Sequence, residues 1–111
     1  MTAKEMAQAV LDAPSACPEF KEAAQKYLNA IGTPDEKKMA EILVAEAEED
    51  ISPIDGTIAF FATDMAKEIF GENVAAQKLA HAKEIKAQGA LYCDCPGCLA
   101  AKAIIDNKHL F

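Results

Sequence analysis

Three of the four cysteines of the chain stand within six residues, in the segment CDCPGC at 93–98. Pro96 is favoured in the first turn of a helix, which places Cys95 at the N-cap and Cys98 about one turn later. Residues three apart on a helix share a face, so these two sulfurs can point to one place. Cys93 lies in the preceding loop, and its sulfur can fold back. The spacing therefore predicts that three thiolates meet one metal ion.

The remaining cysteine, Cys17, also precedes a proline at a predicted helix start. Zinc in structural sites takes four ligands in a tetrahedron, and thiolates are among its preferred ligands. If the helices that begin at Pro18 and Pro96 start side by side, the fourth sulfur comes from Cys17. We therefore predict a zinc site with the ligands Cys17, Cys93, Cys95 and Cys98. An iron–sulfur cluster and copper(I) are the alternatives, since both also bind thiolates.

The same cysteines allow two other interpretations. Cys95-Pro-Gly-Cys98 has the C-x-x-C spacing of thiol pairs that form and break disulfides, which indicates a thiol–disulfide redox switch. In the other interpretation the cysteines are chemically idle and the chain is a stress-related protein-interaction module. There is no glycine-rich phosphate loop, nucleophile elbow or His-Glu-x-x-His helix, so the sequence does not indicate an enzyme.

Hydrophobic residues recur at helical spacing along most of the chain, and no segment alternates with a period of two. Proline, glycine and capping residues divide this pattern into six segments. The predicted helices cover residues 3–13, 18–31, 34–50, 54–70, 73–88 and 96 to near the end of the chain. We therefore expect one all-α domain spanning residues 1–111, a single compact bundle of five or six short helices.

The formal charge is −7, and all eleven basic residues are lysines. This balance argues against nucleic acid as a partner, because a phosphate backbone is bound by clustered lysine and arginine. It also argues against an anionic membrane surface. The N-terminus lacks the pattern of a signal peptide, and no apolar run reaches the length of a membrane span. We expect a cytoplasmic protein whose acidic surface contacts a protein partner.

Two segments carry a resemblance, LYCDCPGCLAAKAII and EEDISPIDGTIAFFATDMAKEIFG. In these segments the sequence resembles a group of short helical proteins from anaerobic bacteria that have a C-terminal C-x-C-x-x-C motif and are labelled heat-shock or chaperone-like. The resemblance extends over most of the chain. It implies a stand-alone cytosolic protein and assigns no functional residues.

Overall fold

The computed structural model describes residues 1–111, and every regular element in it is a helix, which confirms the predicted all-α class. Two chain positions, Pro53 and Tyr92, form an isolated β-bridge, and there is no strand. The count of five or six helices is wrong, because seven α-helices form. They are α1 (Ala3–Asp12), α2 (Pro18–Ala30), α3 (Glu36–Asp50), α4 (Ile54–Phe61), α5 (Asp64–Phe70), α6 (Glu72–Ala87) and α7 (Pro96–Asp106), followed by the 3₁₀ helix η1 (Lys108–Leu110).

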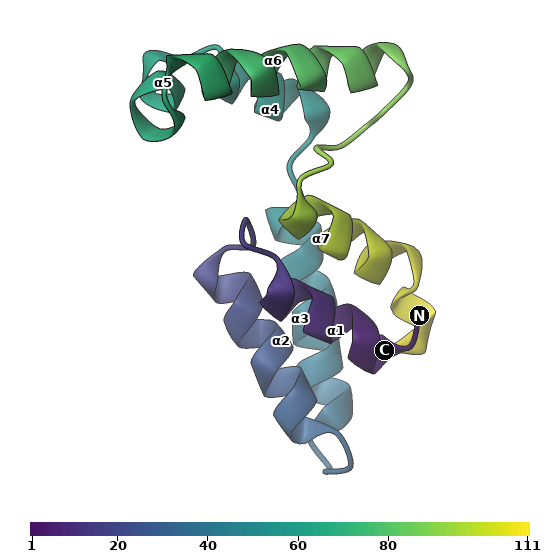
Figure 1. Cartoon of the computed structure of the whole chain (residues 1–111). Helices are drawn as coiled ribbons and strands as arrows, with labels where there is room; N and C mark the ends of the chain where they lie inside the picture. The colour runs from purple at the N-terminus through teal and green to yellow at the C-terminus, as the bar shows by residue number, and fades with distance from the viewer. The chain divides into compact units, whose positions relative to one another are not determined.

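The additional helix arises because the segment predicted as one helix over 54–70 is divided at Thr63 (Figure 1). The Thr63 hydroxyl donates to the carbonyl of Phe60 at 2.6 Å, and its oxygen accepts from the amide of Ala66 at 3.2 Å. A threonine side chain can replace helical backbone bonds in this way, and it is a favoured N-cap. Thr63 therefore ends α4 and begins α5.

The structure reproduces three of the other predicted helix starts and shifts one. Thr2 and Glu5 form a capping box at the predicted start of the first helix, and Pro18 and Pro96 each occupy the first turn of a helix. The helix predicted over residues 34–50 starts two residues later than expected, because α3 begins only at Glu36. The Thr33 hydroxyl donates to the carbonyl of Ala30 at 2.6 Å, so it closes the turn after α2.

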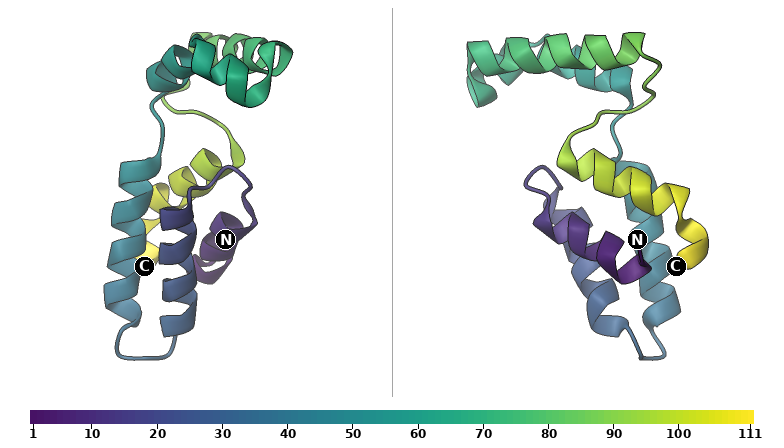
Figure 2. Two further views of the ribbon diagram at one scale, coloured as in Figure 1. Left: turned by 90° about the vertical axis from the view of Figure 1, so that its left-hand side faces the viewer. Right: turned by 45° about the vertical axis from the view of Figure 1, so that its right-hand side comes forward.

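The helices group into two compact units, one formed by residues 1–51 and 94–111 and the other by residues 52–93. The single domain over residues 1–111 stays a prediction. In the first unit α2 and α3 lie side by side as an antiparallel pair (Figure 2). Helix α1 packs on α2 and α7, and α7 also packs on α3. The largest side chains of the shared core are those of Met6, Val10, Phe20, Leu43 and Ile104.

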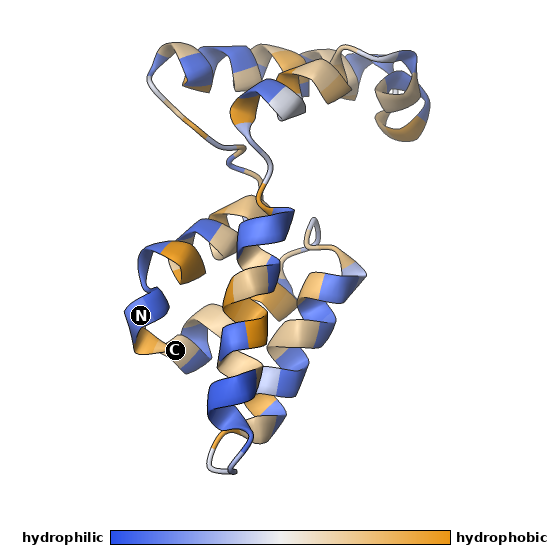
Figure 3. Ribbon diagram, turned by 180° about the vertical axis from the view of Figure 1, so that it is seen from behind, coloured by the Kyte–Doolittle hydropathy of each residue, from blue (hydrophilic) through white to orange (hydrophobic).

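Alanine provides much of the remaining buried surface of the first unit. Its small side chain lets neighbouring helices approach closely, and it is the best helix former. Hydrophilic and hydrophobic residues are interspersed along the helices, as Figure 3 shows. The core is therefore thin, as the composition predicts.

In the second unit α6 packs on α4 and α5. The interior is small, with Ala66, Ala75 and Ala82 among its buried residues. Met65 and Ile69 continue the helical spacing of apolar residues in the segment predicted as one helix over 54–70, which favours an inward position, yet they are 61% and 62% exposed. The break at Thr63 restarts the helix, and α5 turns Ala66 inward instead. No helix of the chain combines the length and the apolar character that a bilayer crossing requires.

Candidate metal centre

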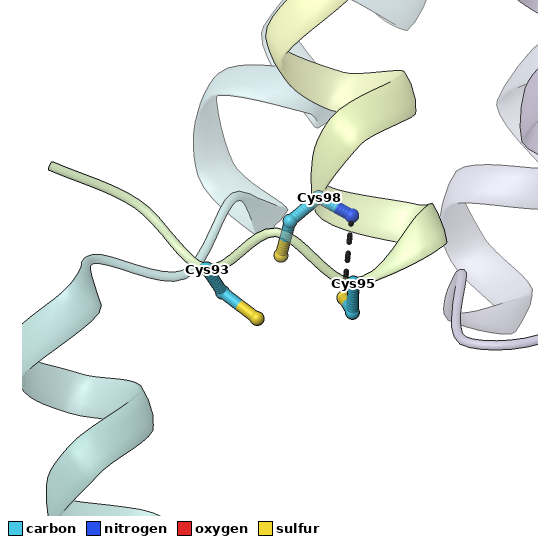
Figure 4. Close-up of side chains that lie close together, drawn as sticks. All are labelled: Cys93, Cys95 and Cys98. Atoms are coloured by element: carbon cyan, nitrogen blue, oxygen red, sulfur yellow. Dashed lines mark hydrogen bonds between the residues drawn. The ribbon is translucent and has the colours of Figure 1, made fainter. Parts of the chain in front are cut away.

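The first turn of α7 positions two of the three clustered cysteines as predicted. Cys95 is the N-cap, with φ −63° and ψ 158°, and its carbonyl accepts from the amide of Leu99 at 2.8 Å. The amide of Cys98 donates to Cys95 Sγ at 3.4 Å (Figure 4). The Cys95 sulfur thus caps the helix, in the place usually taken by a serine or aspartate oxygen.

Cys93 brings a third sulfur from the loop that precedes α7. Its amide donates to the carbonyl of Ser52 at 2.9 Å, which holds this part of the loop in an extended conformation. The sulfurs of Cys93, Cys95 and Cys98 all lie within 4.8 Å of one another and gather on one side of the loop (Figure 4). With Zn–S bonds of about 2.3 Å, two thiolates on a tetrahedral zinc ion are about 3.8 Å apart. The 4.8 Å limit exceeds that separation by only about 1 Å. Small side-chain rotations can therefore bring the three sulfurs to the separation that zinc needs.

The environment of the cluster suits negatively charged sulfur. Cys98 is buried, with 7% of its surface exposed, whereas Cys93 and Cys95 are half-buried. Backbone amides and the dipole at a helix N-terminus attract negative charge, and here the amide of Cys98 points to Cys95 Sγ. The arrangement can bind a soft metal ion, or it can join two of its sulfurs in a disulfide.

A close contact with the loop between α1 and α2 fixes the turn that carries these cysteines. The amide of Gly97 donates to Ser15 Oγ at 2.8 Å. A Cβ at Gly97 would lie 2.9 Å from the amide nitrogen of Ala16 and 3.0 Å from the carbonyl carbon of Ser15. Only glycine allows this approach. Sequence reasoning missed the contact, and the available signal was a glycine in a helical turn where alanine is the better helix former.

Cys17 occupies the same backbone geometry as Cys95. It is the N-cap of α2, with φ −69° and ψ 159°, and Pro18 follows it. Its sulfur, however, does not cap its own helix but donates to Asp50 Oδ2 at 3.2 Å. Cys17 Sγ and carboxylate oxygens of Glu46 and Asp50 lie within 4.8 Å of one another, in a group separate from the three clustered cysteines. The set of four sulfur ligands stays a prediction.

Electrostatics around Cys17 favour its protonated form. Burial raises the pKa of the Cys17 thiol, and the hydrogen bond to Asp50 and the charge of that carboxylate also raise it, while the nearby backbone amide of Phe20 lowers it in part. Glu46 lies one turn before Asp50 on α3. The hydrogen bond between their side chains, with burial and the charge of Asp50, raises the pKa of Glu46 to about 7. Cys17 thus lies against a carboxyl pair that holds a proton near neutral pH.

Sequence reasoning also missed the placement of Glu46 and Asp50 beside Cys17. A signal for it exists, because α2 and α3 are joined by a short turn and must run antiparallel. The end of α3 then lies beside the start of α2. Carboxylates four residues apart at that end face the same way, toward the N-cap of α2.

The fold and the site define an all-α protein with three clustered cysteines at a helix N-terminus. No known protein family, curated protein or solved structure matches the chain. Its resemblance to the short heat-shock-labelled or chaperone-like bacterial proteins stays a prediction.

Proposed function

We propose that this is a small metal-binding protein in which Cys93, Cys95 and Cys98 hold an ion, with zinc as that ion, and that the role of the site is structural or regulatory. The observation that carries the proposal is the mutual proximity of the three sulfurs, all within 4.8 Å of one another. Three thiolates from six consecutive residues form a compact soft-donor set. Such sets select zinc, copper(I) or iron–sulfur clusters over magnesium or calcium.

Zinc fits this donor set best among those metals. It accepts thiolates in a tetrahedron without a redox change, and structural zinc sites commonly use three or four cysteines. Cubane and rhombic iron–sulfur clusters usually take four cysteines in other spacings. Copper(I) remains the principal competitor, because it also binds thiolates.

Cys17 is the proposed fourth ligand. The contact between Gly97 and the segment Ser15–Ala16 supports this, because Cys17 follows Ala16 directly and Cys98 follows Gly97 directly. To reach the ion, Cys17 must give up its hydrogen bond to Asp50 and lose its proton. The lost hydrogen bond to a carboxylate costs about 1.5–3 kcal/mol, which is small beside the binding free energy of a structural zinc ion. The ion would then connect the start of α2 to the start of α7.

Cobalt(II) titration of the reduced protein tests the proposal, because cobalt takes zinc sites and reports its ligands in the visible and near-ultraviolet spectrum. We expect the intense d–d bands of a tetrahedral ion and a sulfur-to-cobalt charge-transfer band. Replacing Cys93, Cys95 and Cys98 together by serine should abolish both, while circular dichroism verifies that the helices remain. Absence of a charge-transfer band in the unaltered protein would refute the metal site.

Cys17→Ser separates the three-ligand from the four-ligand site in the same titration. With four thiolates, the charge-transfer intensity should fall by about a quarter, in proportion to the number of sulfurs. An unchanged spectrum would show that Cys17 is not a ligand and would leave the three clustered cysteines as the site.

A further inference from the structure

Cys95 and Cys98 differ in their access to solvent although one helical turn holds both. Cys98 is buried, whereas Cys95 is half-buried at the N-cap. An oxidant that approaches this turn therefore meets the sulfur of Cys95 first. The sulfur of Cys98, on the same turn, lies within 4.8 Å of it.

The same turn places Cys95, and not Cys98, at the start of the helix. Its sulfur accepts the amide hydrogen of Cys98 at 3.4 Å and lies at the positive end of α7. Attack on a disulfide requires access to the sulfur, and the half-buried Cys95 offers more of it than the buried Cys98. Cys93 is also half-buried, but it lies in the extended loop, where no helix begins at its sulfur.

The backbone allows Cys95 and Cys98 to join without moving. Residues three apart at the start of a helix have Cα atoms about 5–6 Å apart, within the range that disulfides span. Rotation of the two side chains is then enough to close the bond. The contact of Gly97 with Ser15 and Ala16 holds the turn in place during that rotation.

We infer that Cys95 and Cys98 form a redox gate on the metal centre, in which Cys95 reacts with a small-molecule disulfide, Cys98 resolves the product, and the ion is released. This inference rests on the proposed metal binding. The ion leaves because disulfide sulfurs are poor ligands, and of the clustered thiolates only that of Cys93 remains.

The reaction has two steps and transfers two electrons. In the first, Cys95 Sγ attacks one sulfur of the oxidant, the oxidant's S–S bond breaks, and half of it leaves as a thiolate that takes a proton from water. In the second, the thiolate of Cys98 attacks Cys95 Sγ, and the other half leaves in the same way. Two cysteine thiolates are oxidised to one disulfide, and one disulfide is reduced to two thiols.

The test uses the full chain, loaded with zinc and then treated with glutathione disulfide. A chromogenic chelator measures released zinc, and mass spectrometry after alkylation identifies the joined cysteines. We expect zinc release in step with a Cys95–Cys98 disulfide, and recovery of binding after reduction with dithiothreitol. Two variants then assign the roles. With Cys93 also replaced by serine, so that it cannot resolve the adduct, Cys98→Ser should trap glutathione on Cys95, and Cys95→Ser should accumulate no comparable adduct on Cys98.

The outcomes separate this inference from the proposed function. If zinc binds but glutathione disulfide joins other cysteines, or joins none, the redox gate is wrong and the metal site stands. If the reduced protein takes up no zinc, the proposed function fails and the gate fails with it. Cys93→Ser is the control for disulfide formation without the third clustered cysteine. It retains Cys95 and Cys98 and should still form the disulfide between them.

Discussion

Gly97 shows how much of the site depends on one missing methyl group. An alanine Cβ there would lie 2.9 Å from the amide nitrogen of Ala16, and the atoms it meets belong to backbone. Backbone cannot rotate away as the end of a side chain can. The first turn of α7 or the loop that carries Ser15 must therefore shift.

We predict that Gly97→Ala lowers the free energy of unfolding of the metal-free protein by about 1–3 kcal/mol, the usual cost of inserting a methyl group into a packed site. Urea denaturation followed by far-ultraviolet circular dichroism measures it. Gly56→Ala is the matched control, because Gly56 lies inside α4 and a Cβ there meets nothing within 4 Å. That change should be neutral or stabilise by up to about 1 kcal/mol. Equal effects of the two substitutions would contradict the close contact at Gly97.

Residues near one another in sequence were the predictable part of the site. The placement of Cys95 and Cys98 follows from Pro96 and the geometry of one helical turn, and the structure reproduces it. The partner of Cys17 does not follow from local sequence. Its sulfur is hydrogen-bonded to Asp50, which lies 33 residues away in the sequence. Only the packing of α2 on α3 brings the two side chains together.

At the scale of elements, the end of α3 concentrates negative charge where the helix dipole is also negative. Glu46 and Asp50 stand one turn apart there and share a hydrogen bond that raises the pKa of Glu46 to about 7. An unfolded glutamate has a pKa near 4.5. The folded protein thus binds more protons than the unfolded chain between these values, so stability falls as the pH rises through this window.

We predict that the urea midpoint of the metal-free protein decreases from about pH 4.5 to about pH 7 through this carboxyl pair. Glu46→Gln should flatten that part of the profile, because glutamine cannot release a proton. Glu48→Gln changes an exposed glutamate on the same helix and serves as the control. If both variants leave the slope unchanged, the proton is not held at Glu46.

Helix boundaries could be predicted where a strong local signal stands alone. Thr2 with Glu5 marks the start of α1, and Pro18 marks the start of α2. Gly71 marks the end of α5. The division at Thr63 was not predicted, because the hydrophobic stripe continues across it. Whether a mid-helix threonine caps a new helix depends on packing that interrupts the stripe, and α6 lies against both α4 and α5 here.

At the scale of the whole molecule, few large apolar side chains are buried to stabilise the fold. Its buried side chains include many alanines, and a chain of 111 residues buries a smaller fraction of its surface than a larger domain does. Proteins of limited core often gain stability from a bound metal. A ligand at a thousand times its dissociation constant adds about 4 kcal/mol to the stability of the folded form. An ion at the three cysteines would thus contribute on the scale of the entire stability of a small domain.

The zinc content of the native protein tests this account most directly. The protein is purified without an affinity tag and under reducing conditions, and native mass spectrometry then counts the ions on each chain before and after zinc is supplied. We expect one zinc ion per folded chain, and none on the variant in which Cys93, Cys95 and Cys98 are all serine. A folded, fully reduced protein that carries no zinc and takes up none would contradict it.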